Sequence, residues 1–182
     1  MSNNSAKPVG GSGMPLEALI EDARNLDADQ FAERFGSGFL MVMAASAGGL
    51  RGSTSTVLVL DSDPDSGART AGISVVIHSL KPRDGSGGHL VTIGREPNHD
   101  VVVPDLSVSR FHAFVKQEAN GDFLIQDAGS SNGTTVNGNS VMARGAGEPT
   151  RLTPGDTVKF GRVELTFADA KAVREFALQA AA

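Results

Sequence analysis

Short apolar runs separated by turn residues recur along the second half of the chain, and this pattern constrains the fold most strongly. Examples are Leu90–Ile93 and Val163–Phe167, and in the second run apolar side chains alternate with polar ones. Such alternation is typical of a strand with one buried face. The dipeptide Asn137-Gly138 predicts a tight hairpin turn, because both residues tolerate a positive φ. The sequence therefore predicts an all-β body of short antiparallel strands.

The composition agrees with a body rich in turns. The 182 residues include 22 glycines and no tryptophan or tyrosine, and 40% of them are hydrophobic, which is enough for a core. There is no cysteine, so disulfides and thiolate metal sites are excluded. None of the 4 histidines pairs with another at the i, i+4 spacing of a metal site. We expect neither a metal nor a cofactor.

The N-terminal region predicts a tail followed by two short helices. Residues 1–14 are polar and glycine-rich, as in a disordered tail, and they lack the apolar segment of a secretory signal. Pro15 suits a first helical position before an amphipathic run. Asp27 and Gln30 resemble a capping pair for a second helix, which Gly36 would end.

The next segment predicts strands at residues 39–43, 56–60 and 73–80, with an acidic loop at 61–71 and a flexible loop at 83–88. The all-β body is expected to be an antiparallel β-sandwich, and the first two strands either open this sandwich or form a separate appended element. Because they and the helices are small for an independent core, packing onto the sandwich is favoured. The expected division is a tail (1–14), an extension packed on the sandwich (15–70), the β domain (71–168) and a C-terminal helix (169–182) capped by Asp169.

Charge and hydropathy exclude two classes of partner. The net charge is −5, and the predicted N-terminal helices hold six carboxylates against two arginines. The remainder is near neutral and has no basic stripe, so we expect no nucleic-acid binding. The longest apolar run, Phe39–Ala45, is far shorter than the roughly 20 residues of a membrane helix. We therefore expect no membrane insertion and a cytoplasmic location.

Two polar stretches, Ser107–His112 and Gly129–Thr134, lie just outside apolar strands, and upstream the run Thr92–Arg95 presents an arginine at the end of a predicted strand. An arginine at a strand end offers a planar fork that forms two charge-assisted hydrogen bonds with a phosphate. Serine hydroxyls donate and accept, and an asparagine amide can pair with both groups of a peptide backbone. Together these stretches indicate recognition of an anion and a peptide backbone.

The order and spacing of these stretches resemble the forkhead-associated (FHA) domain over roughly residues 72–168. The match includes Ile93-Gly94-Arg95, Ser109-Arg110-Phe111-His112, Asp127–Thr134, Val136-Asn137-Gly138, Gly155-Asp156 and Phe160-Gly161. The resemblance implies a phosphothreonine-peptide site: Arg95 and Ser109 bind the phosphate, Arg110 adds charge or a backbone amide, Ser131 lies near the phosphate, and Asn132 holds the peptide backbone.

The same resemblance implies structural support for the site from other residues. Gly94 frees the backbone for a turn, and His112 ties the recognition loops together by hydrogen bonding. Gly133, Asn137 and Gly138 serve turn geometry. Ser107 and the loop from 137 to 147 would read side chains that follow the phosphothreonine.

We therefore expect a non-catalytic module that binds threonine-phosphorylated proteins or peptides produced by a Ser/Thr protein kinase. The alternative is a phospho-independent scaffold subunit that uses the sandwich as an interaction surface. An enzyme is not expected, because the sequence contains none of the P-loop, Gly-x-Ser-x-Gly or His-Glu-x-x-His motifs.

Overall fold

The computed structural model describes residues 13–46, 72–82 and 90–181. The expectations for residues 1–12, the strand at 56–60 and the loops at 61–71 and 83–88 lie outside this part of the chain. No helix of the described ranges is long and apolar enough to cross a membrane.

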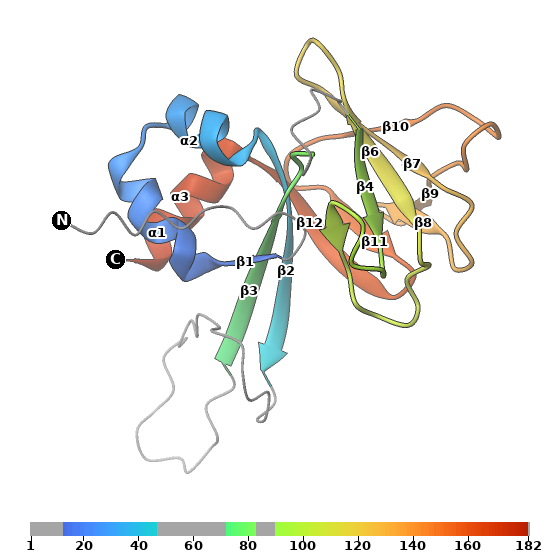
Figure 1. The fold of residues 1–182 in the computed structure, drawn as a ribbon, viewed down its shortest axis with the longest axis horizontal. Helices are drawn as coiled ribbons and strands as arrows, with labels where there is room; N and C mark the ends of the chain where they lie inside the picture. The colour runs from blue at the N-terminus through green and yellow to red at the C-terminus, as the bar shows by residue number, and fades with distance from the viewer. Residues whose placement is uncertain (1–12, 47–71, 83–89, 182) are drawn as a thin grey trace.

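Two β-sheets form the body of the molecule (Figure 1). The seven-stranded sheet has the order β1 (Met14–Pro15), β3 (Gly72–Ser79), β2 (Gly38–Ser46), β12 (Val163–Asp169), β11 (Thr157–Phe160), β8 (Thr134–Val136) and β9 (Asn139–Ser140). The five-stranded sheet has the order β10 (Thr150–Leu152), β7 (Phe123–Asp127), β6 (Ala113–Gln117), β4 (Leu90–Gly94) and β5 (Val101–Val102). Strands β4 and β5 pair in parallel, and the other described strand pairs are antiparallel. The predicted all-β sandwich is confirmed.

The main core lies between the two sheets. Alternate residues of the strands face inward, as Val91 and Ile93 do in β4 and Val115 does in β6, and all of them are buried. The rings of Phe123 and Phe167 meet across the core with centroids 5.4 Å apart. This packing holds the strand ends in fixed positions, and the loops that leave those ends form the groove described below.

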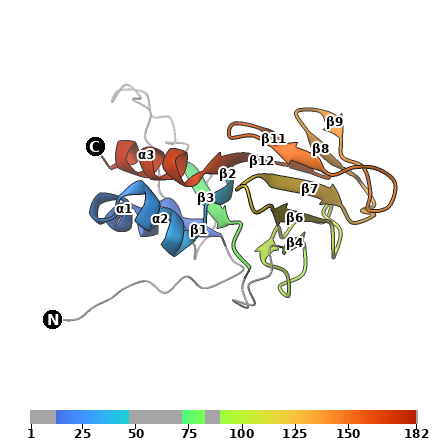
Figure 2. The same ribbon diagram turned by 90° about the horizontal axis from the view of Figure 1, so that it is seen from above.

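Helices α1 (Leu16–Asn25), α2 (Ala28–Phe35) and α3 (Ala170–Ala180) lie together at one end of the molecule (Figures 1 and 2). They pack on strands β2 and β3 and form a second core with members Leu16, Leu19, Ala23, Phe31, Phe35, Phe39, Val75, Ile77, Ala168, Ala170, Val173 and Ala177. The predicted capping pair of α2 is present, because Gln30 N donates to Asp27 Oδ1 at 2.8 Å and Asp27 N donates to Gln30 Oε1 at 3.1 Å. Asp169 caps α3, as predicted.

Strand β2 belongs to both cores. It pairs with β3 on one edge and with β12 on the other, so it is an interior strand of the seven-stranded sheet. Phe39 faces the helical core, and its neighbour Leu40 faces the sandwich core. The domain division at residue 70 remains a prediction, and the structure adds that the segment before it contributes a hydrogen-bonded strand as well as covering helices.

The start of α1 differs from the prediction. Met14, expected in the tail, and Pro15, expected at the first helical position, form β1 and pair with Ile77 and Val76. The helix begins one residue later, at Leu16. The reason is tertiary, because pairing with β3 gives this short segment backbone hydrogen bonds that the local sequence does not encode.

Candidate functional site

Loops from both sheets enclose a groove of about 700 Å³ at one end of the sandwich. The loops follow β4, join β5 to β6, and join β7 to β8. Its lining includes all five residues that the sequence assigned to the ligand: Arg95, Ser109, Arg110, Ser131 and Asn132. Residues 37 positions apart in the chain thus meet at one surface because their strands end at the same edge of the fold.

Arg95 is positioned by its backbone. Strand β4 ends at Gly94, and Arg95 N donates to the Ser109 carbonyl at 3.0 Å. A Cβ atom at Gly94 would lie 2.0 Å from the Arg110 carbonyl oxygen, so only glycine allows the two loops to approach this closely. In the described ranges, no carboxylate forms an ion pair with Arg95 or Arg110. Both guanidinium groups therefore remain available for an anion.

The Ser109 hydroxyl lies between two loops. Its Oγ accepts a hydrogen bond from Ser131 N at 3.0 Å. A hydroxyl has one hydrogen to donate, and this hydrogen is not used by the contact with Ser131. The groove therefore offers a hydroxyl donor beside the Arg95 guanidinium.

His112 bridges the same two loops beneath the groove. Ser109 N donates to Nδ1 at 2.9 Å, and Nε2 lies 3.1 Å from the Gly133 carbonyl, to which it donates. These partners require a neutral ring protonated at Nε2. The ring is fully buried and packs edge-on against Phe160. Burial lowers the pKa of His112 and so favours the neutral form. The hydrogen bond with the Gly133 carbonyl and the negative charge of Asp127 raise the pKa, but their effects are smaller.

Asp127 organises the loop that carries Ser131 and Asn132. Its carboxylate accepts from Gly129 N at 2.7 Å, from Ser130 N at 2.8 Å and Ser130 Oγ at 2.7 Å, and from Thr134 Oγ1 at 2.6 Å. Burial alone would raise the pKa of Asp127, but the hydrogen bonds from Ser130, Thr134 and Gly129 outweigh it and lower the pKa. The buried carboxylate is thus held ionised and fixes the loop.

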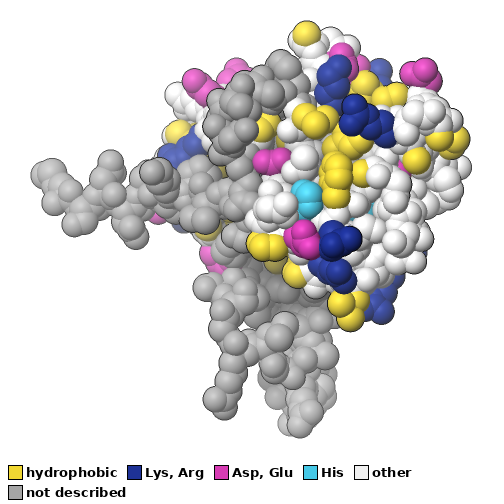
Figure 3. Space-filling view, turned by 45° about the vertical axis from the view of Figure 1, so that its right-hand side comes forward, with side chains coloured by type: hydrophobic (Ala, Val, Ile, Leu, Met, Phe, Trp, Pro, Cys, Tyr) yellow, Lys and Arg dark blue, Asp and Glu magenta, His cyan; other side chains and the backbone are white. Residues whose placement is uncertain are grey.

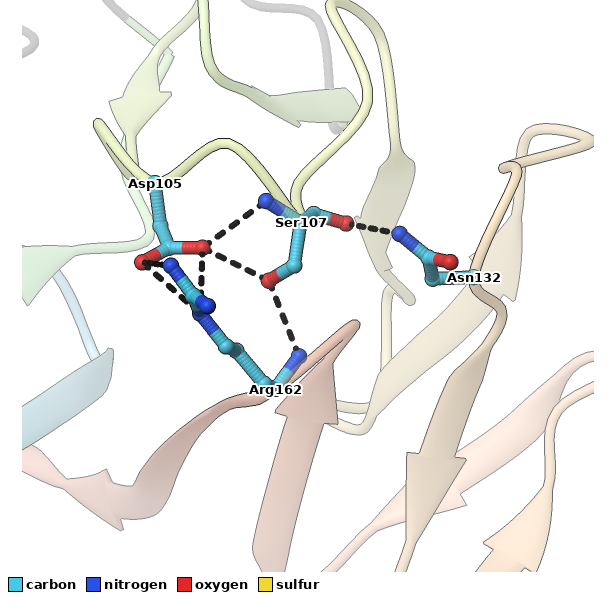
Figure 4. Close-up of polar contacts among 4 residues, drawn as sticks. All are labelled: Asp105, Ser107, Asn132 and Arg162. Carbon is cyan, nitrogen blue, oxygen red and sulfur yellow. Dashed lines mark hydrogen bonds and ion pairs between the residues drawn. The ribbon is translucent and has the colours of Figure 1, made fainter.

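Asn132 is also held by a neighbouring loop. Asn132 Nδ2 donates to the Ser107 carbonyl at 2.7 Å (Figure 4). Asp105 in turn accepts from Ser107 and from Arg162. Hydrogen bonds from Ser107, followed by those from Arg162, lower the pKa of Asp105 to about 2. The carboxylate is therefore ionised at any physiological pH.

The comparison with protein families now identifies this region. Residues 91–161 match the family model of the FHA domain. This part of the chain is an FHA domain. Among curated relatives, the mouse (Mus musculus) protein "Angiogenic factor with G patch and FHA domains 1" is 40% identical over 80 residues, or 42% of this chain and 11% of that protein.

A second curated relative is the glycogen accumulation regulator GarA of Mycolicibacterium smegmatis. It is 39% identical over 74 residues, or 41% of this chain and 42% of that protein. The chain thus spans less than half the length of both relatives. Among solved structures, the FHA domain of FhaA, complexed with the intracellular domain of Rv3910, is 31% identical with a TM-score of 0.38, over 47% of this chain and 92% of that chain.

Sequence reasoning assigned no role to three residues that organise this FHA groove: Asp105, Arg162 and Asp127, although Asp127 stands in the matched stretch Asp127–Thr134. A local signal existed for the two aspartates, because Asp-x-Ser and Asp-x-Gly-Ser sequences favour hydrogen bonds from the carboxylate to backbone N–H groups two or three residues on. Arg162 carried no such signal, since its partner Asp105 is 57 residues away.

The predicted turn at Asn137-Gly138 is present but lies away from the FHA groove. It joins β8 to β9 with φ values of 52° and 81°, as a tight hairpin requires. Asn137 Nδ2 donates to Asp156 at 2.8 Å, and Asn137 Oδ1 accepts from Thr157 N at 2.9 Å. Neither turn residue lines the groove. A supporting role for these two residues in the site therefore stays a prediction, and the structure places them outside the groove.

Apolar and charged groups also line the groove. Leu106 is 83% exposed, and Phe111 stacks on His99 with ring centroids 5.3 Å apart. Glu96 contributes one carboxylate beside the arginines. On the face shown in Figure 3, Lys and Arg side chains gather in separate groups with hydrophobic side chains between them. The described residues include no group of three or more metal-ligating side chains that could hold an ion.

Proposed function

We propose that this chain binds threonine-phosphorylated peptides in the FHA groove. The observation that carries the proposal is the convergence of Arg95, Ser109 and Ser131 on one groove. Among the described residues the Arg95 guanidinium forms no ion pair, and the Ser109 hydroxyl is able to donate. His112 holds these groups in place from below. A dianionic phosphate complements this set.

The arrangement explains how phosphorylation would switch binding. A guanidinium forms two parallel charge-assisted hydrogen bonds with a phosphate, and the Ser109 hydroxyl can add a third. Each hydrogen bond to a charged group contributes roughly 1.5–3 kcal/mol. An unphosphorylated threonine cannot form these bonds, so loss of the phosphate would remove most of the affinity.

The rest of the groove suits an extended peptide. Asn132 presents an amide beside the phosphate site, and Arg110 is exposed at the rim. Leu106 and Phe111 offer apolar surface for the side chains of neighbouring ligand residues. The partner in this proposal is a protein phosphorylated by a Ser/Thr kinase, and we place the interaction in the cytoplasm.

The geometry supports a binding role over catalysis. A serine nucleophile needs a base that accepts its hydroxyl proton. The Nδ1 atom of His112 instead accepts from the Ser109 backbone N–H, and Nε2 faces the Gly133 carbonyl. His112 is therefore not placed to activate the Ser109 hydroxyl.

The test is fluorescence-polarisation binding to a degenerate phosphothreonine peptide library, with phosphoserine and unphosphorylated versions of the same library. We expect selective binding to phosphothreonine that is lost in Arg95→Ala. The matched control is Arg151→Ala, which removes an exposed arginine paired with Asp122, outside the groove lining.

The alternative outcome favours a scaffold. If the chain binds no phosphopeptide, or if Arg95→Ala binds as tightly as the control, the phosphate-reading role is wrong. A partner captured equally with and without phosphatase treatment would then support the phospho-independent scaffold.

A further inference from the structure

The tip of the β11–β12 hairpin lies against two of the three loops that line the groove, the β5–β6 loop and the β7–β8 loop. Gly161 N donates to the Gly133 carbonyl at 3.1 Å, next to Asn132. Gly161 has a φ of 57°, and a Cβ atom there would lie 2.4 Å from the Ser107 carbonyl oxygen. Glycine therefore lets the hairpin reach the Ser107 carbonyl, the same atom that accepts from Asn132.

The next residue, Arg162, closes a network around Ser107. Its Nε lies 3.1 Å from Asp105 Oδ1, and its Nη2 lies 3.2 Å from Asp105 Oδ2. Asp105 Oδ1 also accepts from Ser107 N at 2.8 Å and from Ser107 Oγ at 2.7 Å. The Ser107 hydroxyl in turn accepts from Arg162 N at 3.0 Å. The backbone N–H and the hydroxyl of Ser107 are thus both held by hydrogen bonds (Figure 4).

The Ser107 carbonyl fixes which end of the Asn132 amide faces it. A carbonyl oxygen can only accept, so the group of Asn132 that lies 2.7 Å from the Ser107 carbonyl must be the amide nitrogen. The Asn132 oxygen then points away from Ser107, as Figure 4 shows. No hydrogen bond in the described ranges occupies this oxygen, and Asn132 lines the groove.

We propose that Asp105 and Arg162 are positioning residues of the peptide site: by holding the backbone N–H and the hydroxyl of Ser107 they fix its carbonyl, which orients the Asn132 amide so that its oxygen accepts an N–H from the ligand backbone. This inference rests on the proposed function and assigns how the groove recognises the peptide beside the phosphate. Arg162 lies in the β11–β12 hairpin, which carries none of the loops that line the groove. The proposal therefore makes this hairpin part of the peptide site.

The chain contains a matched control for this role. The pair Arg151–Asp122 has side chains 67% and 25% exposed, and the pair Arg162–Asp105 has side chains 72% and 27% exposed. Exposed ion pairs of this kind contribute little to stability. Arg162→Ala and Arg151→Ala therefore remove equivalent ion pairs, and only Arg162→Ala disturbs the groove.

The first measurement needs no ligand. In 15N–1H spectra of the full chain, the Asn132 side-chain amide should be shifted and protected from solvent exchange in the wild type. We expect this signature to be lost in Arg162→Ala, partly restored in Arg162→Lys, and kept in Arg151→Ala. An Asn132 amide signal that is the same in Arg162→Ala and Arg151→Ala would overturn the positioning role.

The second measurement compares two probes by titration: the best phosphothreonine peptide from the library and phenyl phosphate, which carries no peptide backbone. Loss of one backbone hydrogen bond predicts peptide affinity weaker by about three- to tenfold in Arg162→Ala. Affinity for phenyl phosphate should change by less than about twofold. In an Asn132→Ala background, Arg162→Ala should add no further loss, because both variants remove the same bond.

The outcomes separate this inference from the proposed function. If the wild type binds the peptide but Arg162→Ala and Arg151→Ala bind it equally well, the positioning role is wrong and phosphopeptide binding stands. If Arg162→Ala weakens both probes equally, the network supports the phosphate site and not Asn132, which also overturns the inference. If the wild type does not bind the peptide, both proposals are wrong.

Discussion

At Gly94 two loops approach more closely than any side chain would allow. A Cβ atom at this position would lie 2.0 Å from the Arg110 carbonyl oxygen and 2.5 Å from His99 Cδ2. Gly94→Ala should therefore lower the free energy of unfolding by about 1–3 kcal/mol, as overpacked sites do. Because the displaced loops carry Arg95 and Arg110, phosphopeptide affinity should fall as well. Urea denaturation and peptide titration of the same variant measure the two effects.

The control for this variant is Gly147→Ala. Its added Cβ would lie 2.8 Å from Met142 Cγ and 3.0 Å from Met142 Cβ, so the Met142 side chain would have to shift. Met142 is 47% exposed and can shift toward solvent, whereas the Arg110 carbonyl belongs to the backbone, so we expect a smaller loss of stability than in Gly94→Ala. Equal losses in the two variants would contradict the argument from the close approach at Gly94.

His78 gives the protein a pH-dependent stability. Its side chain is 8% exposed in β3, and burial lowers its pKa from 6.5 to about 4. Below pH 6.5 the unfolded chain binds a proton that the folded chain does not, so stability falls as the pH decreases toward 4. The loss should approach roughly 2–3 kcal/mol. An NMR titration of the ring that gave a midpoint near 6.5 would contradict this prediction.

Residues that line the groove could be predicted from the sequence, and so could the bridge that His112 forms between two loops, but the ion pair beside them could not. Arg95, Ser109 and Asn132 stand in a motif of recognisable order, and the structure brings them to one groove. The ion pair between Asp105 and Arg162 joins residues 57 apart. Its existence depends on where a hairpin tip lies after folding, which neither periodicity nor local turn chemistry encodes.

Helix α2 is eight residues long, so its stability depends strongly on its ends. The capping box of Asp27 and Gln30 satisfies two backbone N–H groups that would otherwise lack partners. Asp27→Ala should lower the free energy of unfolding by about 1 kcal/mol. Asp27→Asn should lower it much less, because asparagine is also a good N-cap residue. Thermal or urea denaturation of the two variants checks this, and equal losses would contradict the capping role.

Helices, strands and turns could be predicted where they depend on residues close by in the sequence, and not where they depend on contacts with distant parts of the chain. The α2 cap and the Asn137-Gly138 turn could be predicted because their partners lie within a few residues. The place of β2 in the sheet could not, since its apolar run fits either an appended hairpin or an interior strand. Pairing with β12, more than a hundred residues later, decides this.

The position of β2 also bears on how the whole molecule unfolds. Its consecutive residues Phe39 and Leu40 enter different cores, so the strand cannot leave one core without disturbing the other. Its hydrogen bonds to β12 continue this connection into the rest of the seven-stranded sheet. We therefore expect the helical core and the sandwich core to unfold in one cooperative transition.

Phe31→Ala tests this coupling from the side farthest from the groove. Phe31 is fully buried in the helical core, with its ring centroid 4.8 Å from that of Phe35 and 6.2 Å from that of Phe39. Its truncation should cost about 3–5 kcal/mol. If the cores are coupled, hydrogen exchange at amides of α3 and of β7 should report the same loss, whereas Leu106→Ala, at an exposed position, should leave both unchanged. Reduced protection confined to the helices would mean that the FHA sandwich is stable without them, and the second core would then be an addition to the fold and not part of its cooperative unit.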